Sequence, residues 1–167
     1  MTVTERQQFD DIDLRILSEL QRDGRIRINE LAERVGITAP PCLRRVRALR
    51  SRGVIQAVRA TLDERMLGYE VMTFVLIQLD SQTLTAIEAF EAAVAAVPCF
   101  LQCWRISGDA DFMLRCVAPS VDDMRQQLLQ FAGLPNVRKI RSFPVLGVSK
   151  DAPLPIPGAL AAESSAS

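Results

Sequence analysis

The spacing of hydrophobic residues near the start of the chain predicts an amphipathic helix. Between residues 10 and 22, one apolar stripe is formed by Ile12, Ile16, Leu17 and Leu20. Acidic residues precede this stripe, where the positive end of a helix dipole favours them. We therefore expect residues 10–22 to form the first helix of a small helical domain.

Two further helices are predicted between residues 29 and 50, joined by a tight turn. In the first of them Leu31 and Val35 stand one turn apart, and Gly36 can adopt the left-handed conformation that ends a helix. The second opens at Thr38 and carries three apolar residues at a spacing of three: Leu43, Val46 and Leu49. Two short helices around a turn are typical of a helix-turn-helix that binds DNA.

Arginines occupy the other faces of the last helix. Residues 38–52 contain five arginines and no acidic residue, and residues 1–60 contain 12 Arg against 8 Asp and Glu, although the whole chain has zero formal charge. A local positive field of this kind suits a phosphate-binding element. The alternative is a solvated basic face without a partner. We expect four arginines to be free to meet phosphate or bases: Arg44, Arg45, Arg47 and Arg50.

The helix starts supply the other candidate DNA-binding residues: Arg27, Thr38, Ala39 and Pro40. Arg27 places a cation at the positive end of a helix dipole, an unfavourable choice that a nearby phosphate would relieve. Thr38 stands at the N-cap of the last helix, but Pro40 and Pro41 lack the amide hydrogens that a capping hydroxyl normally binds. We therefore expect the Thr38 hydroxyl to be available to DNA.

After Gly53 the pattern changes from helical to extended. Residues 54–62 predict a strand that forms a wing or hinge, so the DNA-binding domain spans residues 1–60 and residues 61–70 form a linker. Nearly every residue from Val71 to Leu79 is apolar, which indicates a strand covered on both faces. One cover is expected to be the domain's own helices, and the other a second subunit.

The remaining periodicity completes a β-α-β-β-α-β order over residues 71–150. We expect a helix near residues 84–97, strands at 100–107 and 112–118, a helix after Ser120 that stops at Gly133, and a strand at 137–148. The predicted fold class is thus α+β, with a ferredoxin-like domain after the helix-turn-helix. Pro144 cannot donate to a strand ladder, so it belongs at an edge or a bulge. Residues 151–167, rich in Pro, Ala and Ser, predict a flexible tail.

Composition narrows the chemistry. The chain has no histidine and its four cysteines show no CxxC spacing, which argues against a zinc site, a histidine-based catalytic scheme or a bound cofactor. Cys99 and Cys103 are either a redox pair or reduced thiols packed as small hydrophobes. Asp109 and Asp111 are either a catalytic carboxylate pair or a turn that binds backbone amides; without a companion histidine we expect no enzyme. The absence of a long apolar run and of a signal peptide predicts a cytoplasmic protein without membrane contact.

Together, several short motifs resemble the Lrp/AsnC family of leucine-responsive and asparagine-responsive transcription regulators. They are DDIDLRIL at 10–17, DGR at 23–25, ELAERVG at 30–36, PCLRRV at 41–46, GVI at 53–55, SGDADF at 107–112 and LPNV at 134–137. The resemblance implies a winged helix-turn-helix and a ferredoxin-like regulatory domain that pairs subunits into homodimers, often assembling to octamers. It also implies a small effector, commonly an amino acid, near the Gly-Asp turn.

The effector-binding candidates carried by this resemblance are Ser107, Gly108, Asp109, Asp111 and Ser142. Ile140 and Gly147 depart from the family pattern, because related regulators often carry polar residues there, and each loss removes a group that a zwitterionic ligand would bind. The sequence therefore predicts a regulator that binds double-stranded DNA and responds to a small effector. The alternative is an effector-independent architectural protein that wraps DNA with the same oligomer.

Overall fold

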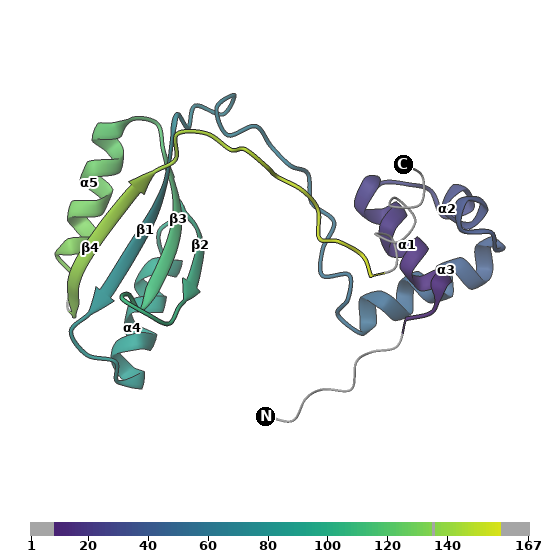
Figure 1. Ribbon diagram of the computed structural model, residues 1–167, viewed down its shortest axis with the longest axis horizontal. Helices are drawn as coiled ribbons and strands as arrows, with labels where there is room; N and C mark the ends of the chain where they lie inside the picture. Colours follow the sequence, from purple (N-terminus) through teal and green to yellow (C-terminus); the bar gives the residue numbers. More distant parts are fainter. Residues whose placement is uncertain (1–8, 135, 158–167) are drawn as a thin grey trace. The chain divides into compact units, whose positions relative to one another are not determined.

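The structure, a computed structural model, describes residues 9–134 and 136–157 (Figure 1). The chain divides into two compact units. Residues up to Thr61 form the first unit together with the segment that starts at Asp151, and Leu62–Lys150 form the second. Each unit has its own hydrophobic core. No helix in the described ranges is long and apolar enough to cross a membrane.

The first unit contains the three predicted helices, α1 (Asp11–Arg22), α2 (Ile28–Val35) and α3 (Ala39–Ser51). Gly36 ends α2 with a φ of 78°, as its position in the sequence predicts. The buried core of the unit is formed by Ile16, Leu31, Ala32, Val35, Cys42, Val46 and Leu49.

Two details of the first unit differ from the sequence predictions. Cys42 is fully buried in α3 and Leu43 only partly, because a spacing of four and then three follows the helical period more closely than two steps of three. Residues 54–62 form no strand: Val54 and Ile55 pack against the helical core, and residues 56–62 have no regular structure. Packing of Val54 and Ile55 against the helical core thus takes the place of the expected strand pairing.

The segment after Asp151 belongs to the first unit. Leu154, Pro155, Ile156 and Pro157 line an apolar groove of about 450 Å³ together with side chains of α1 and of the stretch after α3. The other residues of this groove are Phe9, Leu14, Leu17, Leu20, Gln21, Val54, Ile55, Gln56, Ala57 and Val58. The rest of the tail, expected to be flexible, lies outside the described residues.

The second unit is a four-stranded antiparallel sheet with two helices. Its elements are β1 (Val71–Leu79), α4 (Leu84–Ala95), β2 (Phe100–Arg105), β3 (Phe112–Ala118), α5 (Val121–Ala132) and β4 (Val137–Pro144). The strand order is β2-β3-β1-β4, so the expected β-α-β-β-α-β arrangement is confirmed. Pro144 is the last residue of the edge strand β4, as predicted.

The two faces of the sheet are packed differently. Alternate residues of β1, from Thr73 to Leu79, are buried, and α4 and α5 cover this face with Phe90, Val94, Met124 and Phe131. The other face carries Met72, Phe74, Leu76 and Gln78 of β1, which are half-buried. This second face, which we call the open face, has no covering element within the described chain.

Candidate functional site

Helix α3 presents a stripe of arginines. Arg44, Arg47 and Arg50 recur every third residue and are exposed, and this spacing keeps them on one side of the helix. Within residues 9–134 and 136–157, no ion pair shorter than 4.0 Å involves any of the three. Three extended cations with no carboxylate partner form a surface complementary to a phosphate backbone.

Arg45 is not part of this stripe. Its Nη1 donates to Asp10 Oδ2 at 2.6 Å and to Asp13 Oδ1 at 2.8 Å, which ties α3 to the start of α1. These two carboxylates raise the pKa of Arg45. The expectation that all four arginines are free is therefore wrong for Arg45, because a one-residue step rotates it by 100° toward α1.

The two helix starts retain unsatisfied polar groups. Thr38 is the N-cap of α3 and Arg27 the N-cap of α2, and neither side chain makes a capping hydrogen bond. Both residues are exposed. Asp10, in contrast, caps α1 by accepting from the Asp13 amide at 2.8 Å. The prediction that Thr38 does not cap its helix is confirmed, and its hydroxyl remains available to a ligand.

The Gly-Asp turn between β2 and β3 is shaped by Asp111. Its Oδ2 accepts from the Leu79 amide at 2.7 Å and its Oδ1 from Gln82 Nε2 at 2.7 Å. Its backbone amide also donates to Ile77 O at 2.9 Å, so the residue extends the pairing of β1 with β3. Each carboxylate oxygen accepts a hydrogen bond from β1 or the segment after it, so Asp111 has a structural role at this turn, in agreement with the alternative of a turn that binds backbone amides.

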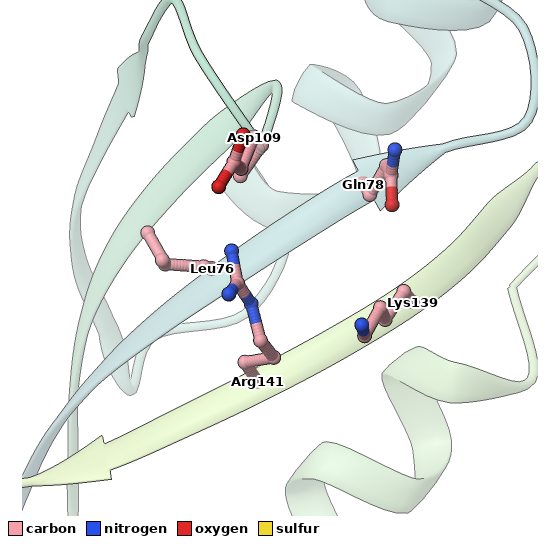
Figure 2. Close-up of a pocket in the computed structure, with 6 residues that line it drawn as sticks. Leu76, Gln78, Asp109, Lys139 and Arg141 are labelled. Atoms are coloured by element: carbon pink, nitrogen blue, oxygen red, sulfur yellow. The ribbon is translucent and has the colours of Figure 1, made fainter.

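Asp109 lines a cavity of about 280 Å³ at the open face of the sheet. Figure 2 shows the arrangement: Leu76 and Gln78 come from β1, Asp109 from the turn, and Lys139 and Arg141 from β4. Ala110 completes the lining. The side chain of Arg141 extends from β4 toward the turn (Figure 2). Two cations and one carboxylate therefore surround one small space.

Lys139 and Arg141 were not among the residues predicted from sequence. The signal that could have found them is the alternation of β4, in which residues 139 and 141 share a face, combined with the register that sets Lys139 opposite Gln78 and Arg141 opposite Leu76. The paired residues of β1 and β4 lie 58 to 71 positions apart in the sequence, and the hydrophobic pattern does not specify their pairing.

The structure separates the other effector candidates. Ser142 lies opposite the buried Val75 and lines a different, mainly apolar groove of about 450 Å³ between α5 and strands β1 and β4. Ser107 and Gly108 are exposed and do not line the Asp109 cavity. Gly108 has a φ of 128°, a conformation that favours glycine, so its role is to form the turn. Asp109 is the only one of the five candidates that lines the cavity.

Two of the four cysteines behave as packed thiols. All four are free, Cys42 and Cys116 are buried, and Cys99 precedes β2 rather than sharing the strand with Cys103. Burial raises the pKa of Cys116 to about 12, and burial also raises the pKa of Cys99. A reactive redox pair needs a lowered thiol pKa, so the redox alternative has no support in this geometry.

Both units match families of known proteins. Residues 9–56 match the winged helix-turn-helix DNA-binding family, and residues 72–155 match the Lrp/AsnC ligand binding domain. A leucine-responsive regulatory protein of Rhizobium meliloti is 43% identical over 148 residues, which cover 88% of this chain and 95% of the relative. The protein of the same name from Escherichia coli K12 is 37% identical over 139 residues, covering 83% and 85%.

Solved structures give the same result. A transcriptional regulator of Neisseria meningitidis in complex with L-methionine aligns with a TM-score of 0.85 at 28% identity, covering 90% of this chain and 98% of the other. A feast or famine regulatory protein of M. tuberculosis complexed with L-methionine aligns with a TM-score of 0.80 at 29% identity, covering 90% and 100%. These matches are to regulators rather than enzymes, in agreement with the sequence. The chain belongs to the Lrp/AsnC family of DNA-binding transcription regulators.

Proposed function

We propose that this protein binds specific double-stranded DNA sites through α3, as a homodimer or higher oligomer, and that an amino-acid effector in the Asp109 cavity tunes that binding. The DNA-binding part rests on the exposed arginine stripe of α3, formed by Arg44, Arg47 and Arg50. Thr38, at the start of the same helix, adds a hydroxyl that makes no capping hydrogen bond. Arg44 and Arg47 lie nearer the helix start, the part of a recognition helix that reads base edges. Arg50 lies later in the helix and is assigned to phosphate.

The open face supports the assembly part of the proposal. Besides the half-buried residues of β1, it carries Phe143 and Trp104, whose side chains are 49% and 37% exposed. Large aromatic side chains are enriched at protein interfaces, and a contiguous exposed apolar patch marks a surface that another molecule covers. We assign the cover of the apolar part of this face to the same part of a second copy, with dimers as the building block of any octamer. The charged Asp109 cavity lies at the end of this face, beside the turn between β2 and β3.

The DNA-binding part is tested by fluorescence anisotropy on a fragment selected from genomic DNA. Arg47→Ala should weaken binding, relax the sequence preference with a cost of about 1–3 kcal/mol for a lost base contact, and leave the fold intact. Arg15→Ala, an exposed arginine of α1 outside the stripe, is the matched control and should bind as the wild type does. Equal affinity of the wild type for every duplex would favour an architectural, shape-reading protein.

The effector part is tested by thermal shift with a panel of amino acids. A ligand at a hundred times its dissociation constant adds about 2.7 kcal/mol of stability, which is readily measured. Asp109→Asn should abolish the shift given by the true effector. No shift with any amino acid would refute this part and favour effector-independent binding, while leaving the DNA-binding part untouched.

A further inference from the structure

The charge of the Asp109 cavity specifies the kind of effector more narrowly than the family does. Lys139 and Arg141 contribute two positive charges and Asp109 one negative charge. Arg141 is half-buried, and no ion pair within the described ranges joins any of the three to another residue. Asp109 lines the same cavity but makes no ion pair with Arg141, so the partly buried guanidinium is left for a ligand carboxylate to bind.

The two cations leave β4 at separate positions, as a ligand with two separate carboxylates requires. Lys139 and Arg141 are two residues apart on β4, so their side chains leave the same face about 6.6 Å apart. Asp109 approaches from the turn between β2 and β3, across β1 from them (Figure 2). One face thus offers two anion sites and, on the other side of the same small space, one site for an ammonium group.

An aliphatic side chain does not suit this cavity. Its apolar lining consists of Leu76 and Ala110, and the other four side chains are charged or amide groups. Burying a leucine or methionine side chain here would remove water from Lys139 and Arg141 without offering them a partner, which costs free energy. Gln78 adds a neutral donor and acceptor that fits a polar ligand. The volume of about 280 Å³ lies just below the range of drug-sized sites, as expected for a small metabolite.

Resting on the proposed effector role of this cavity, we infer that its ligand is an acidic amino acid of the aspartate or glutamate type. Such a ligand carries two carboxylates and one ammonium at neutral pH. One carboxylate meets Arg141, the other meets Lys139, and the ammonium meets Asp109. The net charge of the ligand, minus one, then cancels the net charge of the cavity lining, plus one.

The test is isothermal titration calorimetry of the full chain at fixed ionic strength. The probes are L-glutamate, L-aspartate, L-glutamine, L-leucine, L-methionine, glutarate and sodium sulfate. We expect the acidic amino acids to bind at least tenfold more tightly than L-glutamine, L-leucine or L-methionine. Glutarate, which lacks the ammonium, should bind more weakly than L-glutamate to the wild type, and this difference should vanish in Asp109→Asn.

Variants locate the site. Lys139→Gln and Arg141→Gln should each weaken L-glutamate binding at least tenfold. Arg138→Gln, a change of the same kind on the same strand at a residue outside the cavity lining, should leave it unchanged. Circular dichroism spectra that match the wild type show that each variant is folded.

Three results would overturn the inference. If L-leucine or L-methionine binds as tightly as L-glutamate and Asp109→Asn abolishes that binding, the effector site stands but its acidic specificity is wrong. If sulfate competes as well as L-glutamate at equal concentration, the cavity is a general anion site. If none of the amino acids binds, the proposed effector role fails together with this inference.

Discussion

Replacing Thr38 with alanine tests whether its hydroxyl serves DNA binding or helix stability. The side chain is the N-cap of α3 but makes no capping bond, so its removal should change the free energy of unfolding by less than about 0.5 kcal/mol, as for an ordinary surface change. A neutral hydrogen bond to DNA is worth about 0.5–1.5 kcal/mol. The operator affinity should therefore fall about two- to twelvefold for each α3 bound.

The assay compares three variants by urea denaturation and fluorescence anisotropy. Thr38→Ser keeps the hydroxyl and should retain the affinity for DNA. Ser120→Ala removes a capping bond that does exist, from the Asp123 amide at 3.1 Å, and should destabilise its own unit by about 1 kcal/mol. Trp104 is the single tryptophan of the chain, so its fluorescence follows the regulatory unit, while circular dichroism follows the helices of both units. Loss of about 1 kcal/mol in Thr38→Ala with unchanged DNA affinity would refute the reasoning.

Four other predictions follow from described contacts. The fragment Leu67–Lys150 should sediment as a dimer or larger at micromolar concentration; a monomer would exclude pairing through the open face. Arg45→Ala should destabilise the protein by about 1 kcal/mol in denaturation, because it leaves Asp13 without its cation, whereas Arg47→Ala should not. The Asp13 amide and Arg45 lower the pKa of Asp10 from 3.8, so the stabilising contribution of Asp10 is present above pH 3.8 and is lost as the pH falls through the lower folded pKa. On acidification, Asp10→Asn should therefore lose less free energy of unfolding than the wild type does; an equal loss would contradict this. Asn136 has a positive φ of 71° and its side chain makes two hydrogen bonds to Ser81. Asn136→Gly and Asn136→Ala both remove these bonds, but alanine also adds backbone strain at positive φ, so the alanine variant should be less stable than the glycine variant by about 1 kcal/mol in urea denaturation. Equal stabilities would show that this backbone conformation carries no strain.

Periodicity specified most of the fold. The continuous apolar run at Val71–Leu79 identified β1 to the residue, and the stripe around Ile16 identified α1. The wing strand failed, because Val54 and Ile55 bury their side chains against the helices instead of pairing. A short apolar stretch does not distinguish these two outcomes, since a strand and an irregular segment packed on a core both bury apolar side chains.

The candidate site was only partly accessible to sequence reasoning. The sequence correctly predicted that Thr38 makes no capping bond, because the missing amide hydrogens of Pro40 and Pro41 are a property of adjacent residues. Arg45 was misassigned because its partners Asp10 and Asp13 lie on another helix. Lys139 and Arg141 were missed for a similar reason: their cavity exists only once β4 has paired with β1 in one register. Long-range pairing decides which charges are satisfied and which remain for a ligand.

The path of the chain has a mechanical consequence. The segment from Asp151 returns to the first unit, where Leu154 and Ile156 line the groove beside α1. The regulatory unit is therefore inserted in the chain between two segments of the DNA-binding unit. It is therefore tethered at both of its ends. β1 and β4 are joined to the first unit by separate covalent connections, so a ligand of the proposed kind, bound by both strands, would act on the first unit through both connections.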